Sequence, residues 1–187
     1  MDKKRVIKET LPVLLLVVLG GALAGSVLAW MEEVLSEIPG LIIIVPAIID
    51  MRGNISTALS SRLGSAFHLG LIHQGLFSDV GKENVKGSLA LSLFTSILFP
   101  IFLWLISFVL PFEITFRRLG VIFLISVFTG VTAAFVLIII SFTIVATSIK
   151  FEIDPDNVSG PVLTTAGDVF TLIIMFGYSN LFWWWLL

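Results

Sequence analysis

Five apolar stretches, separated by short polar connections, dominate the hydrophobic pattern of this chain. An α-helix needs about 20 apolar residues to cross the roughly 30 Å hydrocarbon core of a bilayer, and several of the stretches reach that length. We therefore predict an all-α, polytopic membrane protein with five transmembrane helices in a single domain, residues 1–187. The expected helices cover residues 10–30, 41–75, 88–110, 119–148 and 161–187.

Composition agrees with this pattern. Hydrophobic residues make up 57% of the chain and charged residues only 13%, whereas a soluble domain is about one quarter charged. The absence of Cys excludes disulfides and thiolate metal sites, and two His without paired spacing argue against zinc. No catalytic motif stands out, so we expect a protein that is not an enzyme, multi-pass in a plasma or inner membrane, with no nucleic-acid partner.

The basic residues predict the orientation of the helices. Lys and Arg favour the cytoplasmic side of a membrane protein. With the N-terminus inside, the inner segments contain most of the basic residues and the outer loops only two: Lys3, Lys4, Arg5, Lys8, Lys82, Lys86 and Lys150 against Arg117 and Arg118. We expect the C-terminus outside. A cleaved signal peptide is the alternative for residues 1–30, but the apolar run exceeds the usual length of such a segment.

The second apolar stretch contains polar residues at membrane depth. In LIIIVPAIIDMRGNISTALSSRL, residues 41–63, helical spacing places four oxygen-bearing side chains on one face, with Gly53 beside them: Asp50, Asn54, Thr57 and Ser61. Arg52 lies roughly 160° away from Asn54 and points elsewhere. The stretch is too long for a single span, so we expect it to project from the membrane or to break near Pro46.

The fifth stretch contains an acid. Within DPDNVSGPVLTTAGDVFTL, residues 154–172, Pro161, Thr164, Thr165 and Asp168 follow the i, i+3, i+4, i+7 spacing of one helix face. Proline favours the first turn, so Pro161 is expected to begin the helix. An ionisable group inside a span costs roughly 2.5–3.5 kcal/mol and usually faces a bundle interior or a water path. A buried acid that only joins helices is the alternative.

Depth and chemistry suggest that the polar faces of these two helices line one site. Gly53 is expected about 18 Å from the outer end of its helix and Asp168 about 10 Å from the inner end of its own, which are similar levels in a 30 Å core. Carboxylate, hydroxyl, amide and carbonyl oxygens are ligands for hard cations, and Mg²⁺ commonly keeps part of its water shell. Asp154 and Asp156 are candidates for a cytosolic vestibule, although solvated loop acids are the simpler interpretation.

These two segments resemble the MgtE and solute carrier family 41 magnesium transporters. The second-helix signature of that family is matched by Pro46, Gly53, Asn54, Leu59, Arg62 and Leu63. The fifth-helix signature is matched by Pro155, Asp156, Asn157, Pro161, Thr164 or Thr165, Gly167, Asp168 and Thr171. Intramembrane aspartyl proteases also use two Asp, but their Gly-x-Gly-Asp and Tyr-Asp motifs are missing here.

The resemblance implies a five-helix module that forms a parallel homodimer, with a pore lined by the second and fifth helices. The counterpart of Asp168 would bind hydrated Mg²⁺, assisted by the carbonyl of Thr164. The chain departs from the bacterial pattern at Ser56 and Ala58, where Gly and Gln are usual. It carries one module, where solute carrier relatives carry two, and no cytosolic sensor domain, so we expect no gating through such a sensor.

The sequence thus predicts a homodimeric transporter of Mg²⁺, which is its transported ion, in a lipid bilayer. The expected metal-site residues are Asp168, Thr164, Thr165, Asn54 and Asp50, and the expected pore and helix-packing residues are Gly53, Pro161 and Gly167. Two alternatives remain open. One is an exchanger or exporter coupled to Na⁺. The other is a scaffold or sensor subunit that transports nothing.

Overall fold

The computed structural model describes residues 3–71, 78–109 and 114–183. All regular structure in these ranges is helical, and the elements are α1 (Lys3–Trp30), α2 (Glu32–Glu37), α3 (Pro39–His68), α4 (Asp79–Ser107), α5 (Phe116–Lys150) and α6 (Pro155–Trp183). Five of them, all except α2, are long and apolar enough to cross a membrane. The predicted all-helical membrane fold with five candidate spans is therefore confirmed.

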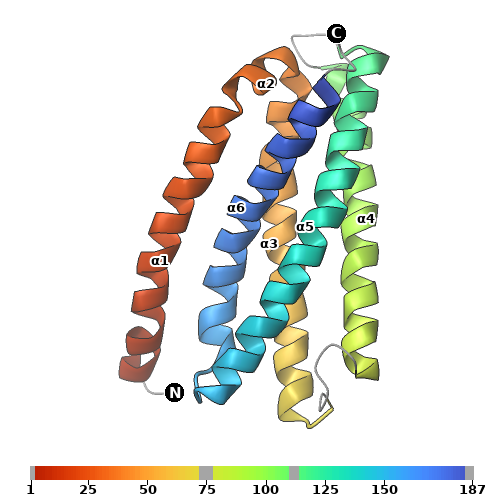
Figure 1. Cartoon of the computed structure of the whole chain (residues 1–187). Helices are drawn as coiled ribbons and strands as arrows, with labels where there is room; N and C mark the ends of the chain where they lie inside the picture. The colour runs from red at the N-terminus through yellow and green to blue at the C-terminus, as the bar shows by residue number, and fades with distance from the viewer. Residues whose placement is uncertain (1–2, 72–77, 110–113, 184–187) are drawn as a thin grey trace.

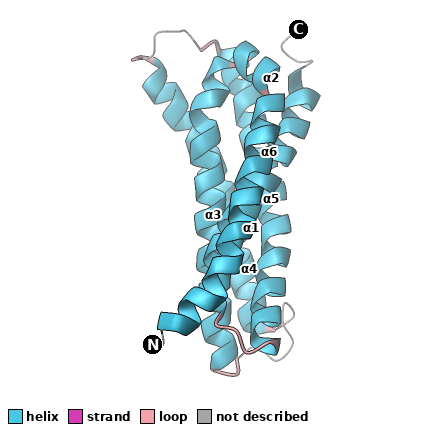
Figure 2. Ribbon diagram, turned by 90° about the vertical axis from the view of Figure 1, so that its left-hand side faces the viewer, coloured by secondary structure: helices cyan, strands magenta, loops and turns pink. Residues whose placement is uncertain are grey.

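The long helices run side by side as an elongated bundle (Figure 1). Helix α6 packs against α1, α3 and α5, and α4 packs against α3 and α5 on the other side of the bundle. The short α2 turns the chain from α1 into α3 at one end (Figure 1). Turning the molecule by 90° shows α1 crossing the front of the bundle obliquely (Figure 2). Helix α1 is thus the peripheral helix, and α3 lies between α4, α5 and α6.

The buried apolar side chains form two clusters, one toward each end of the bundle. One cluster includes Met31, Ile38 and Ile122 and follows α3 as far as Ile48. The other begins on α3 at Leu59 and includes residues of α5 such as Ile138. The middle of α3, residues 49–58, adds no fully buried apolar side chain to either cluster. This middle layer contains the polar residues that the sequence singled out.

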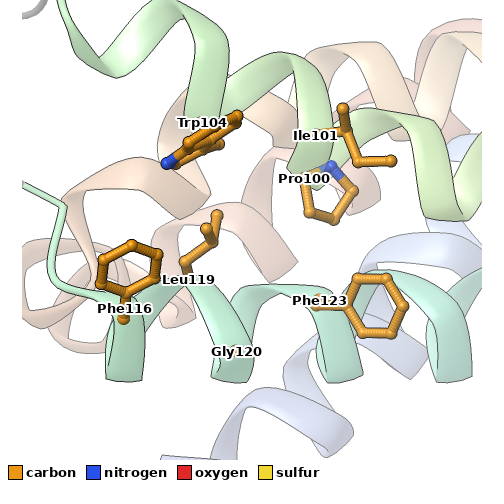
Figure 3. Close-up of a pocket in the computed structure, with 7 residues that line it drawn as sticks. All are labelled: Pro100, Ile101, Trp104, Phe116, Leu119, Gly120 and Phe123. Atoms are coloured by element: carbon orange, nitrogen blue, oxygen red, sulfur yellow. The ribbon is translucent and has the colours of Figure 1, made fainter.

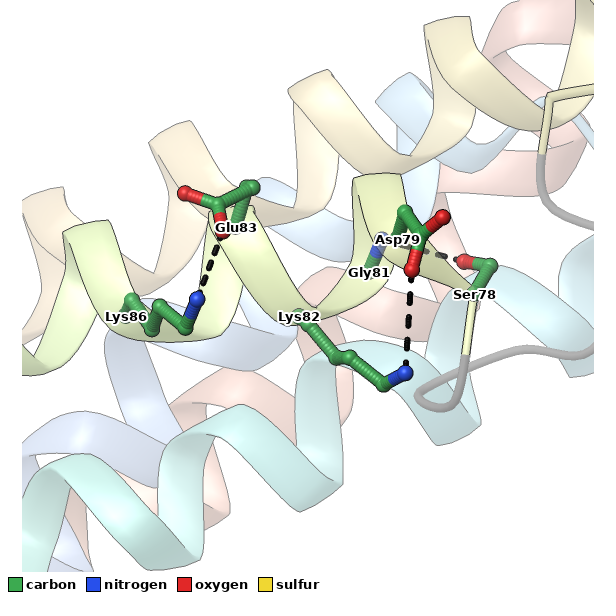
Figure 4. A network of polar contacts seen from close by, with 6 residues as sticks. All are labelled: Ser78, Asp79, Gly81, Lys82, Glu83 and Lys86. Carbon is green, nitrogen blue, oxygen red and sulfur yellow. Dashed lines mark hydrogen bonds and ion pairs between the residues drawn. The ribbon is translucent and has the colours of Figure 1, made fainter.

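Helix α4 begins earlier than expected, at Asp79 rather than near residue 88. Ser78 caps it, because its hydroxyl accepts a hydrogen bond from the Gly81 amide at 3.0 Å. Two pairs at i, i+3 follow, with 3.7 Å between Lys82 Nζ and Asp79 Oδ1 and 2.7 Å between Lys86 Nζ and Glu83 Oε1 (Figure 4). A segment that looked like a polar loop is therefore the first two turns of a helix.

The start of α6 and the course of α3 also differ from expectation. Helix α6 begins at Pro155, and Pro161, expected at the helix start, lies inside the helix. Helix α3 continues through Pro46 without ending there and stops at His68 rather than near residue 75. Proline within transmembrane helices is tolerated because neighbouring groups satisfy the freed backbone. The expected ends at residues 110 and 187 lie outside the described residues.

Candidate cation site between α3 and α6

Helices α3 and α6 are in backbone contact at two glycines. A Cβ built on Gly53 would lie 3.3 Å from the Cα of Thr164, and one built on Gly167 would lie 3.3 Å from the amide nitrogen of Gly53. Backbones therefore touch at this crossing, as small residues permit between membrane helices. Gly53, which the sequence predicted as a helix-packing residue, lies at this contact.

The crossing lies near the middle of both helices. Gly53 is about 21 Å from the start of α3 and about 22 Å from its end, at 1.5 Å per residue. Because α6 starts at Pro155, Asp168 is about 20 Å from the beginning of its helix, rather than about 10 Å as expected. The two segments nevertheless meet at one level, since Gly53 and Gly167 are in contact.

Four side chains form a polar strip beside this crossing, which we call the α3–α6 strip: Asp50, Asn54, Thr164 and Asp168. The first three are exposed on the surface of the single chain, and Asp168 is half-buried. The amide nitrogen of Asn54 donates a hydrogen bond to Asp50 Oδ2 at 2.9 Å. The negative charge of Asp50 repels the carboxylate of Asp168. The structure thus brings two acids, an amide and a hydroxyl together from two helices.

The two adjacent threonines of α6 face different neighbours. Thr164 packs against Gly53, and its hydroxyl donates to the carbonyls of Gly160 and Pro161, both at 3.1 Å. Thr165 packs its methyl group against Gly20 of α1, and its hydroxyl donates to the Pro161 carbonyl at 2.9 Å. Thr165 also lines an apolar cavity of about 250 Å³ between α1 and α6. The structure therefore places Thr164, but not Thr165, beside α3.

The expected vestibule residues lie at the beginning of α6. Asp154 is exposed, and its carbonyl accepts a hydrogen bond from the Asn157 amide at 3.1 Å. The side chain of Asp156 lies outside those that the structure describes.

On α3, Thr57 is half-buried and its hydroxyl has no partner within the described part of the chain, while Ser61 is exposed.

The described residues of one chain do not build a closed metal cage. No group of three or more His, Asp or Glu side chains gathers among them in a way that could hold a metal ion. The α3–α6 strip offers carboxylate oxygens from two residues together with neutral oxygens. This donor set suits an ion such as Mg²⁺ that keeps several of its waters.

Arg52 has a larger role in the structure than the sequence indicated. Its guanidinium is 1% exposed and lies between α3, α4 and α5. Nη1 donates to the Gly130 carbonyl at 3.1 Å. Nη2 donates to the carbonyl of Ser92 at 3.1 Å and to two hydroxyls of α4, those of Thr95 at 2.9 Å and Ser96 at 3.2 Å.

These hydrogen bonds explain how a cation is tolerated at this depth. A charged side chain at the centre of a span costs roughly 2.5–3.5 kcal/mol. A hydrogen bond to a charged group contributes about 1.5–3 kcal/mol, so several of them offset that penalty. The signal in the sequence was the pair Ser92 and Ser96, one turn apart in an apolar helix, together with Gly130. Helical spacing alone could not connect these residues to Arg52.

The bundle also has an apolar groove between α4 and α5, with a volume of about 320 Å³. Figure 3 shows its lining side chains, which include Trp104 and Phe123 on facing helices. Carboxylate, amide and hydroxyl groups are missing from this lining. The groove therefore offers no ligands for a cation, and its surface suits lipid chains.

Comparison with known proteins decides the family. The sequence profile of the MgtE family, described as a divalent cation transporter, matches residues 45–178. This chain belongs to the MgtE family. The match includes both segments of the α3–α6 strip and ends within α6. The resemblance predicted from the two signatures is thereby confirmed, and the chain is a multi-pass membrane protein.

Several relatives in the MgtE family cover most of this chain. Solute carrier family 41 member 3 of Rattus norvegicus is 26% identical over 172 residues, which is 88% of this chain and 36% of the relative. Solute carrier family 41 member 2 of Mus musculus is 30% identical over 163 residues, 83% of this chain and 28% of the relative. Magnesium transporter MgtE of Bacillus subtilis is 27% identical over 176 residues, which is 92% of this chain and 36% of the relative.

The chain spans about a third of the length of these curated relatives. No solved structure matches it. The relatives therefore establish the family, while the geometry of the α3–α6 strip has to be interpreted from this structure itself.

Proposed function

We propose that this MgtE-family chain conducts Mg²⁺ across the membrane through a pore at the axis of a homodimer, lined by α3 and α6. The observation that carries the proposal is the α3–α6 strip. Asp50, Asn54 and Thr164 are exposed on the single chain although each lies roughly 13 Å or more from either end of its helix. Polar groups at such depth are costly against lipid, so a second copy facing this strip would give them an aqueous path.

The chemistry of the strip suits a hydrated divalent cation. Asp168 supplies the central negative charge, and Thr164, Asn54 and Asp50 supply further oxygens around it. Two-fold symmetry would place two copies of each group about one axis. Mg²⁺ is usually held through one or two carboxylates and keeps several waters, which matches a pair of Asp168 side chains. A divalent ion would also relieve the repulsion between Asp50 and Asp168.

The remaining predicted residues support the strip. Gly53 and Gly167 allow α3 and α6 to touch, so that the two acids share one level. Pro161 accepts hydrogen bonds at its carbonyl from both threonines, and Thr165 packs α6 against α1. With the N-terminus inside, Asp154 and Asp156 would lie at the cytosolic mouth, where their charges attract cations.

Flux into liposomes tests this proposal. We expect wild-type protein to carry Mg²⁺ down its gradient, and Asp168→Asn to remove most of that flux because the oxygen geometry stays while the charge is lost. Glu37→Gln is the matched control, since it removes the charge of an exposed acid of α2 that lies outside the strip. Unchanged flux in Asp168→Asn would contradict the proposal. Repeating the assay with and without a sodium gradient separates a passive pore from a Na⁺-coupled exchanger.

A further inference from the structure

The polar network around Arg52 lies on a different face of α3 from the α3–α6 strip. Residues 50–54 of α3 meet three different surroundings within little more than one turn. Asp50 and Asn54 are exposed, the Gly53 backbone touches α6, and the Arg52 side chain enters the junction with α4 and α5. Any rotation of α3 would therefore change all three contacts together.

We infer that Arg52 is a positioning residue for the cation site, because its guanidinium fixes the rotation of α3 against α4 and α5. The transport readout of this inference rests on the proposed function. Its structural readout does not.

The two terminal nitrogens of the Arg52 guanidinium bind two different helices. Nη1 reaches α5 at the Gly130 carbonyl, while Nη2 reaches three acceptors on α4. The fork that these nitrogens form is rigid and planar, so bonds to two helices fix its orientation and that of the helix that carries it. The single nitrogen of a lysine cannot hold both helices in this way. The geometry of Arg52, and not only its charge, is what joins the three helices.

The packing of α4 against α5 leaves room for the Arg52 guanidinium. A Cβ at Gly130 would collide with Ser96 Oγ and would lie 3.4 Å from Arg52 Nη2, so only glycine fits there without a shift. Ser126 on α5 donates to the Ser96 carbonyl at 2.7 Å and so joins α5 to α4 beside the same site. None of the carboxylates among the described residues forms an ion pair with Arg52. Its partners are therefore helix atoms that position it.

The location of the network supports the same role. It occupies the layer between the two apolar clusters, where residues 49–58 of α3 add no fully buried apolar side chain. Apolar contacts tolerate small rotations, because they are not directional. Hydrogen bonds lose strength steeply when they are misaligned. A directional contact at this level therefore specifies the side of α3 that faces outward.

An electrostatic role for Arg52 predicts the opposite effect on cation affinity. If its positive charge mainly repelled Mg²⁺, its removal would lower the KM for Mg²⁺ flux. If Arg52 positions the strip, its removal displaces Asp50 and Asn54 from Asp168 and raises KM. For Arg52→Gln we expect KM to rise about fivefold, the size typical of residues that couple to a site without touching the ligand.

The first experiment measures KM for Mg²⁺ flux in liposomes for Arg52→Gln and Arg52→Lys. Both should raise KM, because neither side chain has a fork. The matched control is Ser60→Ala, which alters a fully buried residue of α3 outside the network and should keep the wild-type KM. A fall of KM in Arg52→Gln, or a wild-type KM in Arg52→Lys, would overturn the inference.

The second experiment follows the rotation of α3 directly. The chain has no Cys, so single cysteines report without background. Ala58 is exposed on the face of Asn54, whereas Ser60 is 0% exposed. With Arg52 present, a small thiol reagent should label Ala58→Cys much faster than Ser60→Cys. In the Arg52→Lys background, the labelling rates of Ala58→Cys and Ser60→Cys should become similar, because α3 is no longer fixed in one rotation.

The two experiments separate the possible failures. An unchanged ratio of labelling rates in both Arg52 variants would show that Arg52 does not set the rotation of α3, whatever the flux. Absence of Mg²⁺ flux in the wild type would overturn the proposed function, while the labelling ratio would still decide the role of Arg52. If Arg52→Gln cannot be purified as a folded protein, Arg52→Lys carries both tests.

Discussion

Two polar regions share the middle of α3 and differ in how their polar groups are satisfied. On the face toward α4 and α5, Arg52 is 1% exposed and its terminal nitrogens donate to four acceptors. Beside the contact with α6, Asp50 and Asn54 are exposed and share one hydrogen bond, from the Asn54 amide to Asp50 Oδ2. Burial and hydrogen bonding therefore distinguish two kinds of polar group within one membrane helix.

We call the first the closed region, because its polar groups bond within the bundle, and the second the open region, because its side chains are exposed. Both arise from the same short stretch of sequence, residues 50–54. Each region also has a glycine at a tight helix contact, Gly130 in the closed region and Gly53 in the open one. Substitutions of Gly53 and Gly130 therefore test the open region and the closed region separately.

The largest effect is expected at the open region from Gly53→Leu. A single added Cβ already lies 3.3 Å from Thr164, so a larger side chain must push α6 away and separate Asp168 from Asp50. We expect Mg²⁺ flux to fall to background and the free energy of unfolding to drop by about 1–3 kcal/mol. Liposome flux and unfolding in detergent measure the two effects. Gly21→Leu is the control, since nothing lies within 4 Å of a Cβ at Gly21. Equal flux in both variants would mean that the α3–α6 contact does not matter for transport.

The closed region should respond to Gly130→Ala chiefly in stability. The added methyl collides with Ser96 and crowds Arg52, so the free energy of unfolding should fall by about 1–3 kcal/mol. Gly120→Ala, on the same helix but with open space around it, should be nearly neutral. If both variants unfold alike, the packing around Arg52 is looser than the structure indicates.

A smaller effect is expected from Asp50→Ala. This acid lies beside Asn54 and acts on Asp168, but it is more exposed and so more strongly screened. We expect the apparent Mg²⁺ affinity in flux assays to fall by about tenfold or less, which is the order of a single charge near a protein surface. Asp50→Asn retains the shape and should behave like the alanine variant. Unchanged affinity and unchanged divalent selectivity would remove Asp50 from the site and leave Asp168 in place.

Much of this arrangement could be predicted from the sequence, because helical spacing and membrane thickness constrain it strongly. The shared face of Asp50 and Asn54 and the different direction of Arg52 follow from the number of residues per helical turn. The family signatures added the pairing of the second and fifth spans. These inferences depend on positions within one helix or on the bilayer itself.

Other features could not be predicted, because they depend on contacts between helices. Pro161 looked like a helix start, but Pro155 fills that position and a membrane helix tolerates the second proline. Thr165 shares a stripe with Asp168 yet packs against Gly20, since α1 covers that side of α6. The partners of Arg52 lie on α4 and α5, at sequence separations of 40 and 78 residues for Ser92 and Gly130. Sequence periodicity gives the direction of a side chain but not the partner that it meets.

We propose that a divalent cation is held at the α3–α6 strip on the axis of two chains. Equilibrium Mg²⁺ binding to the purified protein, measured by calorimetry together with the oligomeric state, tests it most directly. We expect one central Mg²⁺ for every two chains, lost in Asp168→Asn and retained in Glu37→Gln. Binding with unchanged stoichiometry and affinity in Asp168→Asn would contradict it.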